Sequence, residues 1–125
     1  MRICVAQTRP VKGDIEANIH SHLKLIGVAV SAETDFMIFP ELSITGYEPG
    51  LVKELATTQD DVRFDLFQKI SDANCITIGI GVPTPACNSV CISQVYLQPG
   101  KRRECTPRCF CILLKRSILF AETVT

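Results

Sequence analysis

Hydrophobic positions at the start of the chain show two periods, one typical of strands and one typical of helices. Residues 2–7 (RICVAQ) form a short apolar run that a proline and a glycine close off. Asp14 suits a helix N-cap, and apolar residues then recur every three or four positions, at Ile15, Ile19, Leu23, Ile26 and Val30. The spacing predicts an amphipathic helix that ends near 31–35. A fully apolar strand of the kind found in a covered sheet follows at 36–39 (FMIF).

The same two patterns continue after a loop at 40–50. Residues 51–56 (LVKELA) predict a short helix, and 60–74 predict a second amphipathic helix. The apolar face of the second helix would carry Val62, Leu66, Phe67, Ile70 and Ala73. Two further strands are predicted at 75–83 and 89–98. Strands that alternate with helices are typical of a layered α/β fold, so we expect the four strands to be neighbours in one sheet.

Composition narrows the class of protein. The 125 residues suit one domain. The 13 basic and 13 acidic residues give no net charge, so nothing indicates an electrostatic surface for nucleic acid or an anionic membrane. The first apolar run is too short for a secretion signal, and no stretch reaches membrane-spanning length, so we expect a cytoplasmic protein. Without a secretion signal, the seven cysteines do not predict a disulfide framework. Cys4, Cys75 and Cys91 lie in strand-like runs and are interpreted as buried free thiols.

The pattern changes at residue 105. The tail, 105–125, has no clean periodicity and begins with Cys105, Cys109 and Cys111. A zinc site is one interpretation of these cysteines, but their spacing lacks a fourth ligand, so we predict no metal. His20 and His22 lie on the first predicted helix, where we expect surface residues rather than ligands. We therefore divide the chain into a domain at 1–104 and a separate tail.

Glu41 is the candidate for chemistry. It follows the apolar strand 36–39 in the stretch FPELSITGYEPG. Loops at the carboxyl ends of strands in α/β proteins gather ligands and catalytic groups. A glutamate there is either a surface or helix-capping carboxylate or, in a buried setting, a general base. The spacing alone leaves both interpretations open.

Three motifs in order resemble the N-terminal part of the nitrilase, or carbon–nitrogen hydrolase, family. They are a strand that ends in Ala-Gln, then Gly-Asp-x-x-x-Asn opening a helix, then Phe-Pro-Glu-Leu with Thr-Gly-Tyr. The similarity covers about residues 2–103. It implies the N-terminal half of an α-β-β-α sandwich and a Glu–Lys–Cys triad that needs no metal or organic cofactor. In such a triad the glutamate activates the thiol, the lysine stabilises the tetrahedral intermediate, and water releases the acid.

The resemblance assigns roles to one loop. By position, the family's glutamate falls on Glu41, which would be the general base. Pro40 would fix the backbone that enters the site, Gly46 would supply a positive φ, and Tyr47 would complete the support of the loop. The expected substrate is a small amide or nitrile.

The lysine and the cysteine of the triad are absent. The family's lysine lies in a Tyr-x-Lys…Leu-His context and its cysteine further on, and the sequence has neither motif. Lys101 falls in a predicted turn at 99–101 and is interpreted as a solvated hairpin residue. Cys109 and Cys111 come too soon after the preceding strand. We therefore expect this chain to be inactive by itself.

A shifted reading frame accounts for the tail. Back-translation from the third base of the Cys105 codon can read Tyr-Ser-Lys-Met-Phe-Leu-His-Pro, which closely matches the family's lysine segment. The tail is then an out-of-frame reading of the gene. The alternative function is a non-catalytic module that packs on a partner chain through an exposed sheet edge, and homo-oligomer formation stays open.

Overall fold

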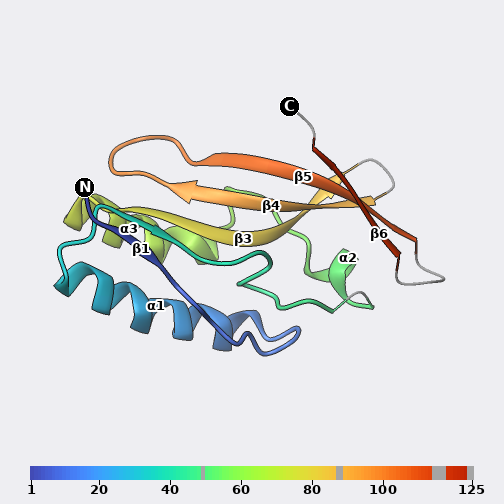
Figure 1. Cartoon of the computed structure of the whole chain (residues 1–125), viewed down its shortest axis with the longest axis horizontal. Coiled ribbons are helices and arrows are strands. Elements are labelled where there is room, and N and C mark those ends of the chain that lie inside the picture. Colours follow the sequence, from blue (N-terminus) through green and yellow to red (C-terminus); the bar gives the residue numbers. More distant parts are fainter. Residues whose placement is uncertain (49, 87–88, 114–117, 124–125) are drawn as a thin grey trace.

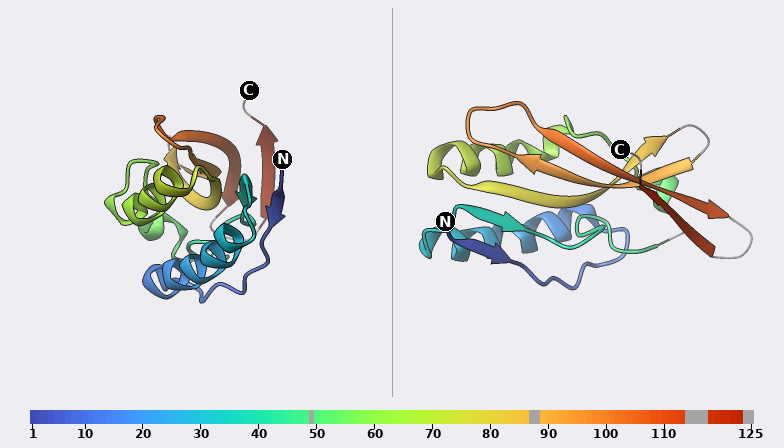
Figure 2. Two further views of the ribbon diagram at one scale, coloured as in Figure 1. Left: turned by 90° about the vertical axis from the view of Figure 1, so that its left-hand side faces the viewer. Right: turned by 45° about the horizontal axis from the view of Figure 1, so that its top comes forward.

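One sheet organises the chain, with α1 (Ile15–Ser31) and α3 (Asp65–Asn74) packed on one face (Figures 1 and 2). The computed structural model describes residues 1–48, 50–86, 89–113 and 118–123, with side chains described as far as residue 107. Within those ranges six strands lie side by side in chain order. They are β1 (Ile3–Val5), β2 (Phe36–Ile38), β3 (Thr77–Ala86), β4 (Ser89–Leu97), β5 (Glu104–Leu113) and β6 (Ile118–Thr123).

The sheet is mixed. β1, β2 and β3 run parallel, and β4, β5 and β6 continue as antiparallel neighbours. The four strands predicted from the sequence are therefore adjacent in one sheet, as expected, and the α/β class is confirmed. The two strands of the tail, β5 and β6, were not predicted, because the segment has no clean alternation of apolar and polar residues.

The core lies between the sheet and the two long helices. Alternate strand residues point to this face, so Met37 of β2, Ile80 of β3 and Val95 of β4 meet Ile26 of α1 and Phe67 of α3. The opposite face carries the remaining strand residues. On β1, Ile3 and Val5 expose 64% and 73% of their surface there.

Helix α1 forms where the spacing predicts it. Asp14 caps it, because its carboxylate accepts a hydrogen bond from the Ala17 N–H at 3.1 Å. The expectation that both histidines lie at the surface is wrong for one of them. His20 is exposed, whereas His22 is fully buried.

The second amphipathic helix is present, but part of its predicted face is wrong. Val62 and Leu66 expose 77% and 51% of their surface, and Ala73 is exposed as well, while Phe64 is fully buried. The reason is a 3₁₀ turn, η1 (Val62–Phe64), which precedes α3. Three residues per turn rotate the chain differently from an α-helix, so Phe64 takes the core position that Val62 was expected to fill.

The structure also describes three of the cysteines and the short helix predicted at 51–56. Cys75 is exposed rather than buried, because it forms the left-handed C-cap of α3 with a φ of 52°, and β3 starts only at Thr77. Cys91 is buried as expected and Cys4 is half-buried, whereas Cys87 lies outside the described residues. The short helix α2 (Val52–Leu55) forms within 51–56 as predicted.

The turn between β4 and β5 is joined to α3. Lys101 is exposed in this turn, as predicted, and its N–H donates to the Gln98 carbonyl at 3.3 Å. Arg103 forms an ion pair with Asp65 at 2.6 Å and donates to the Gln59 carbonyl at 3.1 Å. These contacts anchor the hairpin. No helix in the described part of the chain is long and apolar enough to cross a membrane.

Candidate active site

The loop that carries Glu41 is fastened to β3 at both ends. Glu41 follows the carboxyl end of β2, within the tight turns of residues 41–45. Before it, the Phe39 N–H donates to the Gly79 carbonyl at 2.8 Å. After it, the Ile44 N–H donates to the Gly81 carbonyl at 3.1 Å. We call residues 40–46 the glutamate loop.

Gly81 lets the glutamate loop approach β3 closely. A Cβ at this position would lie 2.3 Å from the Pro40 carbonyl oxygen and 2.4 Å from the Leu42 nitrogen. Both are backbone atoms, so no side-chain rotation could make room. The peptide of Glu41 therefore rests directly on a strand position that only glycine can occupy.

Asn18 joins two of the sequence motifs. It is the asparagine of Gly-Asp-x-x-x-Asn, and it is buried on α1. Its side-chain amide donates to the carbonyls of Ile44 at 2.8 Å and Val11 at 2.9 Å, and its oxygen accepts from the Val11 N–H at 2.7 Å. The second motif thus holds the glutamate loop of the third motif by direct hydrogen bonds.

His22 lies one helical turn beyond Asn18 and also contacts this loop. Its Nε2 is 2.9 Å from the hydroxyl of Ser43, and its Nδ1 is 2.6 Å from the Asn18 carbonyl. Burial lowers the pKa of His22 from 6.5 to about 4, and the hydrogen bond to Asn18 opposes part of this shift. Sequence reasoning missed this residue. The helical spacing from Ile15 and Ile26 places position 22 on the buried face and could have found it.

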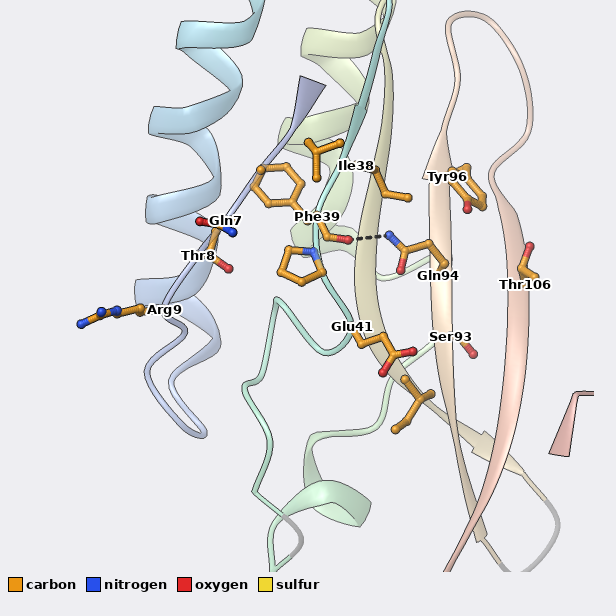
Figure 3. Close-up of a pocket in the computed structure, with 14 residues that line it drawn as sticks. Gln7, Thr8, Arg9, Ile38, Phe39, Glu41, Ser93, Gln94, Tyr96 and Thr106 are labelled. Carbon is orange, nitrogen blue, oxygen red and sulfur yellow. Dashed lines mark hydrogen bonds between the residues drawn. The ribbon is translucent and has the colours of Figure 1, made fainter. Parts of the chain in front are cut away.

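A cleft of about 890 Å³ opens beside Glu41 (Figure 3). Its walls include Val5, Ile38 and Tyr96, which point to the sheet face opposite the helices. Gln94, also in the lining, donates to the Phe39 carbonyl at 3.0 Å and braces the entry to the glutamate loop. The full lining is Val5, Ala6, Gln7, Thr8, Arg9, Ile38, Phe39, Pro40, Glu41, Ile92, Ser93, Gln94, Tyr96 and Thr106.

The structure places the four predicted site residues in different environments. Glu41 lines the cleft and is exposed, and Figure 3 shows its side chain directed toward β4 near Ser93. Pro40 also lines the cleft. Gly46 is buried and has the positive φ expected of it, 71°. Tyr47 is exposed and is not among the lining residues.

The cleft as described offers a carboxylate and hydrogen-bonding groups. Its lining residues include neither lysine nor cysteine. Among the residues with described side chains, no group of three or more His, Cys, Asp or Glu could hold a metal ion. The groups present can accept a proton and orient a polar molecule, and a thiol or an ammonium group would have to come from outside the lining residues.

The glutamate loop lies within a segment that matches the model of a known protein family. The model of the carbon–nitrogen hydrolase family matches residues 2–108. The chain belongs to the carbon–nitrogen hydrolase family. The resemblance drawn from the three motifs is therefore confirmed. The match ends within β5, and the division of the chain at residue 105 stays a prediction.

Three proteins are similar to this chain over part of their length. A glutamine-dependent NAD(+) synthetase from Thermotoga maritima is 37% identical over 49 residues, which is 39% of this chain and 8% of the synthetase. An N-terminal amidase solved with a Gln-Gly peptide superposes with a TM-score of 0.73 at 19% identity, over 92% of this chain and 29% of the amidase. A carbon–nitrogen hydrolase superfamily protein from Xanthomonas campestris, with an arsenic adduct in its active site, gives 0.75 at 15% identity, over 93% and 43%. The chain spans less than half the length of each relative.

Proposed function

We propose that this chain carries the glutamate portion of a carbon–nitrogen hydrolase that cleaves a small amide or nitrile. In the proposal Glu41 is the general base, and Pro40, Gly46 and Tyr47 support its loop. The main observation behind the proposal is that the Glu41 peptide packs directly against Gly81 of β3, beside a cleft of about 890 Å³. A carboxylate held by its backbone at the end of a strand is set for repeated proton transfer.

Of the three groups that the proposed reaction needs, this chain supplies the glutamate, and a cysteine and a lysine are not assigned in it. Glu41 would take the proton from a cysteine thiol, and the thiolate would then attack the carbonyl or nitrile carbon. A lysine would stabilise the charge that develops on the substrate, and water would release the acid. Since neither partner of the triad is assigned here, we propose that the 125-residue chain has no turnover by itself.

Glu41 is exposed in this chain, and the proposal accounts for that exposure. The relatives of known structure are much longer, since the chain spans 29% of the amidase and 43% of the Xanthomonas campestris protein. Further family segments packed over the open sheet face would bury the cleft and bring the thiol and the lysine to it. The shifted reading of 105–125 supplies a candidate for the lysine segment.

The nucleotide sequence of the gene and an activity assay test this proposal. The nucleotide sequence should continue, in the frame that begins at the third base of the Cys105 codon, into a family-like lysine and then a cysteine segment. The chain translated in that frame from residue 105 onward, which we call the frame-restored chain or enzyme, should release ammonia from short primary amides or from the matching nitriles. The 125-residue chain, assayed in parallel, should release none. Stop codons at once in that frame, or turnover by the 125-residue chain, would contradict the proposal.

A non-catalytic module is the second candidate. The observation in its favour is the exposure of Ile3 and Val5 on β1, an edge strand with apolar side chains on the uncovered sheet face. Such a surface is typical of a site that another polypeptide covers. If the shifted frame meets stops at once while the 125-residue chain binds a partner through β1, this candidate gains over the enzyme.

A further inference from the structure

His22 is a buried titratable group that the triad chemistry does not use. It lies on α1 with no exposed surface, and its ring stacks on Phe39 with centroids 4.1 Å apart and planes at 24°. Phe67 contacts it from α3 with centroids 5.9 Å apart. A charged imidazolium would lose its hydration among these aromatic rings, so the ring is neutral near pH 7, and its pKa is about 4.

The hydrogen bonds of the neutral ring have a fixed direction. Nδ1 lies 2.6 Å from the Asn18 carbonyl, which can only accept, so Nδ1 carries the hydrogen. Nε2 is then an acceptor and takes the hydroxyl hydrogen of Ser43 at 2.9 Å. The Ser43 oxygen accepts in turn from the Gly81 N–H at 3.0 Å. The three hydrogen bonds form one line: Gly81 donates to Ser43, Ser43 donates to His22, and His22 donates to the Asn18 carbonyl.

Every member of this line contacts the glutamate loop or belongs to it. Ser43 is in the loop, two residues after Glu41. Gly81 supports the Glu41 peptide from β3, and Asn18 holds the Ile44 carbonyl at 2.8 Å. The buried ring therefore connects α1 and β3 through the loop, where a ring that only filled space would connect neither.

We propose that His22 is a positioning residue for Glu41: as the Nδ1–H tautomer, it accepts the Ser43 hydroxyl hydrogen bond and fixes the glutamate loop on β3. The proposal deepens the proposed function and rests on Glu41 as the general base. It also gives Ser43 a definite role, since the serine hydroxyl bonds both the ring and the strand, at 2.9 and 3.0 Å.

Hydrogen exchange followed by mass spectrometry on the 125-residue chain tests the first half. His22→Phe keeps an aromatic ring on Phe39 and removes both hydrogen bonds. We expect the amides of residues 41–46 to exchange at least ~10-fold faster, while those of 65–74 keep their rates. His20→Phe, the same change at an exposed position of the same helix, should alter neither segment. Equal acceleration in both segments, or in neither, would overturn the proposal.

Two further measurements keep the test decisive if His22→Phe does not fold. Ser43→Ala leaves the ring in place and removes its donor, so it should open residues 40–46 to a similar extent. An unchanged loop in Ser43→Ala would overturn the proposal. The ¹⁵N shifts of the His22 ring should show the Nδ1–H tautomer, and an Nε2–H tautomer would equally contradict it.

The frame-restored enzyme tests the second half. His22→Phe should lower kcat by about 10- to 100-fold and leave KM nearly unchanged, because a misplaced base slows the chemical step without weakening substrate binding. An unchanged kcat would overturn the positioning role. Activity that survives Glu41→Gln would instead refute the proposed function, while the exchange experiment would still decide whether His22 fixes the loop. The two failures are therefore distinguishable.

Discussion

Replacing Gly81 by alanine should displace the loop that carries Glu41. The new Cβ would lie 2.3 Å from the Pro40 oxygen, 2.4 Å from the Leu42 nitrogen and 2.9 Å from the Glu41 carbonyl carbon. Ordinary contacts begin at about 3.5 Å, so the loop backbone has to move by roughly 1 Å. No rotamer change can relieve the clash, since all three atoms belong to the backbone.

The magnitude follows from two losses. Overpacking by one methyl group costs about 1–3 kcal/mol, and the hydrogen bond from the Gly81 N–H to Ser43 is worth about 1 kcal/mol more. We therefore expect Gly81→Ala to lower the free energy of unfolding by roughly 2–4 kcal/mol. For a domain of this size that is a fall in Tm of about 10 °C or more. In the frame-restored enzyme, kcat should fall as well.

Two other glycines provide matched controls in thermal and urea denaturation. Gly27 lies on α1, where an added methyl group would have open space within 4 Å, so Gly27→Ala should stabilise the chain by up to about 1 kcal/mol. At Gly79 the Cβ would meet the Tyr96 ring at 2.9 Å, and a ring can turn aside, so Gly79→Ala should cost less than Gly81→Ala. If Gly81→Ala costs no more than Gly79→Ala, the loop does not rest on β3 as described.

Three further outcomes are expected. The folded-state pKa of His22, about 4, lies below its ordinary 6.5, so the unfolded chain binds the proton more readily and stability should fall between pH 7 and pH 4. This pH-dependent contribution of His22 to the free energy of unfolding is roughly 3 kcal/mol. Urea titrations at several pH values should show that His22→Phe lacks it. Asn18→Ala removes the side-chain partner of the Val11 N–H and of the Ile44 carbonyl, while the Val11 carbonyl keeps the Asp14 N–H as a donor. The change should cost about 2–4 kcal/mol in the same assay, whereas Asn74→Ala, at an exposed helix end, should cost much less. The apolar surface at Ile3 and Val5 should make the 125-residue chain self-associate in sedimentation velocity, and a monomer at high concentration would contradict this.

The order of elements was predictable because each element has a strong local signal. α1 combines a capping aspartate with five apolar residues at helical spacing, and β2 is an unbroken apolar run. That four of the strands are neighbours in one sheet followed from the alternation of strands and helices. The position of Glu41 at the end of β2 followed from the same signals, and the motifs supplied its proposed role.

The parts of the site that were missed depend on contacts between distant residues. Gly81 lies 40 residues from Glu41, and nothing in the strand sequence around it shows that a loop rests on it. His22 was judged by residue type, although its place in the helical period indicates burial. Cys75 was assigned to a strand because its neighbours are β-branched, but the left-handed cap of α3 occupies that position.

The most direct test of the central claim is the activity of Glu41→Gln in the frame-restored enzyme. Glutamine keeps the shape of the side chain but cannot accept the thiol proton, so amide hydrolysis should fall by about two to four orders of magnitude. Thermal denaturation should show the fold unchanged. Glu48→Gln, in the same stretch but outside the cleft lining, is the matched control and should retain full activity. If Glu41→Gln keeps most of the activity on small amides, Glu41 is a loop carboxylate and the account of this site is wrong.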